Sequence, residues 1–90
     1  MDNRFERFFI RNDETGLIEV WSCPCAIGDG HYAVGVDYII NEGFYRHGFE
    51  KTDKANEFLE EVKRHYANKC HRVPKLSVVK VVLNLEILNV

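Results

Sequence analysis

Acidic residues are missing from a long stretch of this chain. Between Glu61 and Glu86 there is no Asp or Glu, while Lys and Arg occur six times. Residues 1–61 hold 13 acidic and 6 basic residues, a net charge of -7 that faces +6 in the acid-free stretch. The total charge of -2 therefore conceals a polarised molecule, and such polarity bears on partners and electrostatic steering more than on the fold.

Long apolar runs, a signal sequence and an even number of cysteines are also missing. No uncharged run approaches the roughly 20 residues of a membrane span, and Met1–Arg7 lacks the apolar core of a signal peptide. Three cysteines cannot all pair within one chain, which favours a reducing compartment. We therefore expect a cytoplasmic protein with no membrane partner. Because 90 residues have room for one hydrophobic core, residues 1–90 are predicted to form a single domain.

The clearest predicted element is a helix over Asp53–Ala67. Its apolar residues recur at the spacing that lines one face of a helix, namely Ala55, Phe58, Leu59, Val62 and Tyr66. The side chain of Thr52 or Asp53 is expected to cap the first turn. No Pro or Gly interrupts the segment, so the helix is predicted to be continuous.

Before this helix the apolar pattern has a period of two. The alternation predicts a strand over Tyr32–Ile40, and Phe44–Phe49 is predicted to pair back on it as a hairpin. A second hairpin is expected from Phe8–Arg11 and Leu17–Cys23, joined by turn residues. Residues 4–10 leave two alternatives open, since their phenylalanines fit either a strand or a short helix.

The segment Leu76–Val90 is rich in Val, Leu and Ile, which favours a strand after the helix. A strand of this length is longer than small domains usually contain, so it is expected to bend near Asn84 or to overhang the sheet. An overhanging apolar strand exposes an edge that a protein must cover or use. We therefore predict a homodimer formed by β-pairing of residues 76–90.

These elements together predict an α+β fold. It consists of an antiparallel sheet of four to five strands with one amphipathic helix packed on one face, in the order β-β-β-β-α-β.

Four residues of zinc-binding type occur as two pairs, Cys23 with Cys25 and Cys70 with His71. The spacing argues against a metal, because structural zinc sites usually begin with two Cys separated by two to four residues and only Pro24 stands here. The alternative interpretation is a set of small, buried apolar side chains. No cofactor is therefore expected, and a zinc-binding structural domain is kept as a second alternative.

The sequence names no reaction. Acid–base catalysis would need a cleft that gathers His31, Asp37 and His47, but no motif supplies a nucleophile or a phosphate-binding loop. We expect a protein that is not an enzyme.

The basic segment is the better candidate for a binding site. Lys63 and Arg64 are expected in the last turns of the helix, where cations complement the partial negative charge of the C-terminus. The helix dipole does not account for the remaining cations, which lie in a short loop: Lys69, His71, Arg72 and Lys75. These side chains could contact phosphates or an acidic protein surface, and a solvated loop is the alternative.

The run Gly48–Thr52, followed by Ala55, Phe58 and Leu59, resembles the junction between sheet and helix in two kinds of module. These are the arm-type DNA-binding domains of phage tyrosine integrases and the WGR domains. The resemblance implies a helix packed on a meander of strands. In size and layout the chain is also similar to small phage-encoded inhibitors such as anti-CRISPR proteins.

The function that these patterns favour is binding without catalysis. We expect a small protein-interaction module, of the type of a phage or mobile-element accessory or inhibitor protein, with a protein partner. The alternative is a nucleic-acid-binding protein that uses the basic segment 63–75, and retention on heparin that weakens steeply with salt would distinguish the two.

Overall fold

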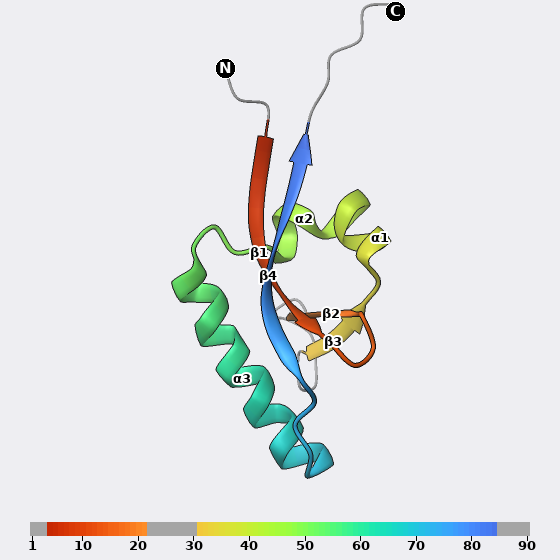
Figure 1. The fold of residues 1–90 in the computed structure, drawn as a ribbon, viewed down its shortest axis with the longest axis vertical. Helices are drawn as coiled ribbons and strands as arrows, with labels where there is room; N and C mark the ends of the chain where they lie inside the picture. The colour runs from red at the N-terminus through yellow and green to blue at the C-terminus, as the bar shows by residue number, and fades with distance from the viewer. Residues whose placement is uncertain (1–3, 22–30, 85–90) are drawn as a thin grey trace, which may run out of the picture.

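A four-stranded antiparallel sheet organises the computed structural model, which describes residues 4–21 and 31–84. Its strands are β1 (Arg4–Asn12), β2 (Ile18–Trp21), β3 (His31–Val34) and β4 (Leu76–Asn84). The spatial order is β3-β2-β1-β4, so that β4 lies at one edge beside β1 (Figure 1). The predicted α+β class is confirmed, as is the first hairpin as far as Trp21 and the strand after the helix as far as Asn84, while residues 22–23 and 85–90 of these predictions lie outside the described residues. The N-terminal segment is a strand and not a helix.

The long helix α3 (Thr52–Cys70) covers one face of the sheet. Its buried residues Ala55, Phe58 and Val62 pack with Ile10 of β1, as the helical spacing predicted. The helix starts one residue earlier and ends three residues later than predicted. The cap prediction was wrong, because Lys51 occupies the N-cap position and no side chain caps the first turn. The helix ends at Cys70, and the C-cap residue His71 has a left-handed φ of 56°, with Pro74 three residues further on.

The other face carries the helical segments α1 (Val36–Tyr38), the π-helix η1 (Ile39–Gly43) and α2 (Phe44–His47). The prediction of strands over Tyr32–Ile40 and Phe44–Phe49 was therefore wrong beyond Val34. The alternation of apolar and polar residues matches the structure only as far as Val34. The buried positions after Val34 are Ile39, Gly43 and Phe44, which follow a helical spacing.

Two hydrophobic cores result, one on each face of the sheet. Phe9, Ile18, Val20, Ile39 and Phe44 form the core under α1, η1 and α2, and Phe8 contributes to the core under α3. Phe8 and Phe9 point to opposite faces, since side chains alternate along a strand. Helices on both faces replace the single helix that the sequence predicted, and Figure 1 shows the sheet between them.

Candidate functional site

Strand β4 is one of the two edge strands of the described sheet, and β3 is the other. It pairs with β1 along nine residues, from Arg4 opposite Asn84 to Asn12 opposite Leu76. Within residues 4–21 and 31–84, no strand pairs with the outer edge of β4. Backbone N–H and C=O groups that point outward from an edge strand are ready to pair with another chain.

The two ends of β4 differ in how much of the fold covers them. Leu76 and Val78 belong to the core under α3. Val82 points to the same face but belongs to neither core, because it lies beyond the helix. The N-terminal half of β1 (residues 4–8) and the C-terminal half of β4 (residues 80–84) form a two-stranded ribbon, and the end of this ribbon extends past the helices in Figure 1.

β2 does not reach this ribbon. Its register with β1 comprises only Ile10 with Glu19 and Arg11 with Ile18. Two residues before Ile10 in β1, Phe8 exchanges two backbone hydrogen bonds of 2.8 and 2.9 Å with Phe49, in an isolated bridge. The segment around Phe49 therefore attaches the ribbon on this side, in addition to the packing of Phe5 and Leu83 on the core under α1, η1 and α2.

Three charged side chains of the ribbon, those of Arg4, Glu6 and Lys80, form a short row on one face. The Glu6 carboxylate lies 2.8 Å from Arg4 Nη2 and 3.8 Å from Lys80 Nζ. Lys80 is the only charged residue in β4 and is 47% exposed. These three residues were not selected from the sequence, because only the register between β1 and β4 brings Glu6 and Lys80 together.

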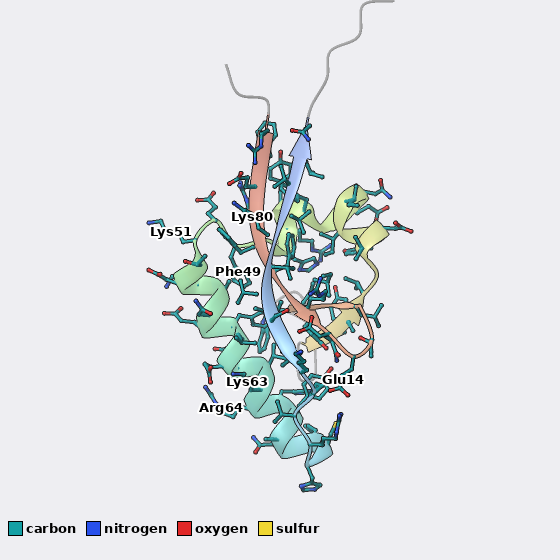
Figure 2. All side chains as sticks on the ribbon, in the orientation of Figure 1. Glu14, Phe49, Lys51, Lys63, Arg64 and Lys80 are labelled. Atoms are coloured by element: carbon teal, nitrogen blue, oxygen red, sulfur yellow. The ribbon has the colours of Figure 1, made fainter. Side chains whose placement is uncertain are left out.

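The basic segment lies at the other end of the sheet, and one of its cations, Arg72, is paired with an acid. The Arg72 guanidinium donates to Glu14 Oε1 at 2.6 Å, and the Lys75 backbone N–H donates to Glu14 Oε2 at 2.7 Å. The hydrogen bond from Arg72 is the main reason that the pKa of Glu14 lies below its ordinary value of 4.5. Figure 2 shows Glu14 and Lys80 at different levels along the molecule.

A neighbouring acid strengthens this contact. Asp13 Oδ1 accepts hydrogen bonds from Arg11 Nε at 2.8 Å and from Ser77 Oγ at 3.0 Å. The bond from Arg11 is the main reason that the pKa of Asp13 is lowered. The backbone N–H of Asp13 also donates to the Lys75 carbonyl at 2.8 Å. The turn between β1 and β2 thus holds the loop after α3, a contact that sequence analysis missed because the partners lie about 60 residues apart.

The other predicted binding residues are spread along α3. Lys63 is bound to Glu60, with 3.4 Å between Nζ and Oε1, and Arg64 is exposed on the next position of the helix. Their predicted place in the last turns was wrong, because the helix continues to Cys70 and Lys69 is the basic residue of the last turn. Lys69 and His71 are exposed at this end, so the structure brings only part of the predicted set together.

A cleft of about 350 Å³ opens between this loop and the first turn, and Tyr66, Cys70 and Arg72 line it. Behind it lies a buried carboxylate, Glu19, which is 2% exposed. The Tyr66 hydroxyl donates to Glu19 Oε1 at 2.6 Å, and burial together with this bond raises the pKa of Tyr66 to about 12. Asn12 Nδ2 also donates to Glu19, at 3.3 Å. These contacts explain why a glutamate tolerates the interior of the sheet.

None of the three comparisons, with protein-family models, curated proteins and solved structures, finds a match. Function has therefore to be argued from the geometry of the described residues. Among these, no helix is long and apolar enough to cross a membrane.

The zinc prediction is only half covered by the structure. Cys23 and Cys25 lie outside the described residues, while Cys70 and His71 are adjacent and exposed. Within the described ranges, no group of three or more His, Cys, Asp or Glu side chains could hold a metal ion. The zinc ligand set therefore stays a prediction.

The three residues named for acid–base catalysis are placed in part. Asp37 is exposed on α1, whereas the His47 ring lies between the rings of Tyr32 and Tyr38, with centroid distances of 6.3 and 6.1 Å. Burial is the main reason that the pKa of His47 is lowered, with the nearby charge of Arg46 adding to it. His47 is thus accounted for by aromatic packing.

Proposed function

We propose that this protein is a non-catalytic interaction module that binds an extended segment of a partner protein along the outer edge of β4. The observation that supports the proposal is the open edge of a nine-residue strand that carries a single charge. Natural proteins usually protect such an edge with several charges, a proline or a covering element.

The binding mode follows from antiparallel pairing. Because β1 engages the backbone groups of alternate β4 residues, the groups of the other residues point away from the sheet. A partner strand would pair with them, and its side chains would meet Lys80 and Val82 on one face and Val81 and Leu83 on the other. Backbone pairing would supply affinity and these side chains would supply selectivity.

The homodimer predicted through residues 76–90 uses the same edge. The described part of that segment is β4 itself, and residues 85–90 lie outside the described residues. An inhibitory or accessory role, as in the small phage proteins of similar layout, is included in this proposal because an added strand can occupy a site on a partner without chemistry.

Amide hydrogen exchange tests the binding mode. In the monomeric chain, the amides of β4 should divide into two alternating sets, one protected by β1 and one exchanging quickly. A bound partner should slow the second set and leave the first unchanged. Protection that appears on α3 or on the loop 71–75, with β4 unchanged, would contradict the proposal.

A matched pair of variants tests the position of the interface. V82K adds a charge to the edge at a residue outside both hydrophobic cores, whereas K63E changes a charge on α3. We expect proteins captured from a native extract by the original chain to be lost with V82K and retained with K63E. Loss with K63E alone would move the interface to α3.

The basic segment supports a second proposal, nucleic-acid binding. Its favouring observation is that Lys69, His71 and Arg72 are exposed together where α3 ends. The contact with Glu14 weakens this second proposal, since the Arg72 guanidinium is already bound by a carboxylate. A mobility shift at low salt that disappears steeply as salt is raised would support this second proposal, and no shift at low salt would remove it.

A further inference from the structure

We infer that a second copy of this chain occupies the β4 edge, with the two β4 strands antiparallel and Val81 directly opposite Val81 of the second copy. This inference rests on the proposed function and identifies the partner and its register. The symmetry of a strand pair, the position of Lys80 and the charges that β1 places beside β4 select this register.

Symmetry limits the registers to a few. Two copies related by a twofold axis through a continuous sheet have side chains on the same faces, and directly opposite residues must share a face. One residue therefore lies opposite its own copy and defines the register. The residues near the middle of the open edge are Val79, Lys80, Val81 and Val82.

Two of these registers place Lys80 badly. With Lys80 on the axis, the two ammonium groups face each other, and like charges directly opposite are destabilising. With Val79 on the axis, Lys80 of the second copy faces Val78, whose neighbour on β1 is Ile10. Val78 packs against the core under α3, so in this register the lysine lies beside an apolar row of Val78 and Ile10 that offers it no acid.

The register with Val82 on the axis is unfavourable for a different reason. Lys80 of the second copy would then face Asn84, whose neighbour on β1 is Arg4. The ammonium group would enter a row that ends in a guanidinium group, and only five residues of each strand would pair within the described strand.

The register with Val81 on the axis places the same lysine in a row with an acid. Lys80 of the second copy faces Val82, and the neighbour of Val82 on β1 is Glu6. Neighbouring strands lie about 4.8 Å apart, so Glu6 and that lysine stand about 10 Å apart at their backbones and their long side chains can meet above Val82. The twofold axis repeats this ion pair on the other side of the dimer.

Access to the edge favours the same register. Pairing centred on Val81 uses residues 78–84, from Val78 at the margin of the core under α3 to the last residue of the described strand. It leaves Leu76 outside the dimer contact, where α3 packs on the sheet. Seven residues of each strand would pair.

Cysteine crosslinking tests the register directly. In the full chain with the native cysteines replaced (C23S, C25S and C70S), the variants V79C, K80C, V81C and V82C each place a single thiol on β4. A residue opposite its own copy brings two Cα atoms to about 4.5–5.5 Å, within the range of a disulfide. Under a mild oxidant, V81C should form a covalent dimer roughly tenfold faster than the other three.

Each outcome decides a separate claim. Fastest crosslinking at another position overturns the register. A monomeric mass by light scattering at high micromolar concentration, with no variant crosslinking and all variants melting as cooperatively as their parent, overturns self-association. In that case, protection of the outward β4 amides by another protein would still support the proposed function, so the two failures are distinguishable.

The charge argument has its own test. K80E brings a carboxylate beside Glu6 of the second copy, and the dissociation constant of the dimer should rise roughly tenfold. K63E, on a helix away from the edge, should leave it unchanged. An unchanged dissociation constant for K80E overturns the Val81 register, which alone places the two groups in one row.

Discussion

The two ends of the sheet meet the same need, the satisfaction of charged and polar groups, in different ways. At the end near α3, Glu14 binds Arg72 and the Lys75 amide at 2.6 and 2.7 Å, so charges from distant parts of the chain satisfy each other. At the ribbon end, Glu6 contacts Arg4 at 2.8 Å and Lys80 at 3.8 Å, both within the ribbon, and the outer edge of β4 faces no strand of the described structure. The loop end joins distant segments through paired charges, whereas the ribbon end pairs its charges locally and leaves a backbone edge open.

This difference shows why an uneven distribution of charge along a sequence is a poor guide to a binding surface. The acid-free stretch is strongly basic in sequence, yet the turn between β1 and β2 places Asp13 and Glu14 against it. Backbone groups at an edge carry no net charge, so no composition count finds them. Four substitutions test this difference between the ribbon end and the loop end.

The attachment of the ribbon is the most sensitive point. A Cβ atom at Gly48 would lie 2.6 Å from Arg7 Cβ and 2.6 Å from the Phe44 carbonyl. G48A should therefore separate the Phe8 to Phe49 bridge and lower the free energy of unfolding by about 3 kcal/mol in chemical denaturation. Exchange of the β1 amides at the ribbon end should rise more than exchange at the loop end.

The matched control is G35A, at a glycine that has no heavy atom within 4 Å of the added Cβ. Its stability should remain within about 0.5 kcal/mol of the original chain. Equal losses for both variants would mean that the ribbon is not held through Gly48.

The loop end has one buried contact that should matter almost as much. Y66F removes the 2.6 Å hydrogen bond to Glu19, a carboxylate that is 2% exposed. Loss of a partner by a buried polar group should lower the free energy of unfolding by about 2 kcal/mol. Y45F changes a tyrosine that is 60% exposed and should have almost no effect, and a similar loss in both variants would contradict this role of Glu19.

Most of the fold was predictable because its local signals agree with its tertiary environment. The first hairpin and the helix over Asp53–Ala67 each combine a clear apolar period with turn or helix-forming residues, and packing strengthens both. The segment 36–47 was mispredicted because a run such as Val36, Tyr38 and Ile40 alternates and yet also fits a short helix. The contact of Ile39 and Phe44 with the core under η1 decided between the two, and that contact is not local.

The candidate site was predictable only in outline. The C-terminal segment was selected for its length and β-branched residues, and β4 is indeed an edge strand, as an added strand after the helix could be. The row of Arg4, Glu6 and Lys80 depends on the register between residues about 80 apart in the chain. Nothing local in the sequence specifies which residue of β1 stands opposite Val82.

Acid should weaken the loop end first. Hydrogen bonds lower the pKa values of Asp13 and Glu14 below 3.8 and 4.5, so both carboxylates bind protons more weakly in the folded chain than in the unfolded one. Their contribution to stability is complete above about pH 4.5 and is lost as the pH falls through the lowered values. Denaturation curves measured from pH 6 to pH 2 should show this loss.

The variant E14Q separates this effect from general acid unfolding. It should flatten the part of the pH profile that Glu14 causes, and it should release Arg72, so that retention on heparin increases. The ribbon-end variant E6Q should leave heparin retention unchanged. Retention that stays constant in E14Q would show that Arg72 is not restrained by Glu14.

The smallest expected effect is at Lys80. Its ammonium group is 3.8 Å from Glu6 and about half exposed, so the pair should contribute less than about 0.5 kcal/mol to the stability of the monomer. K80A should therefore unfold at the same denaturant concentration as the original chain at low protein concentration. A large loss of unfolding free energy in the K80A monomer would show that the fold itself needs Lys80, as it needs the paired charges at the loop end. A neutral result, together with weaker self-association at high protein concentration, would show that the charge at this end serves contacts between chains.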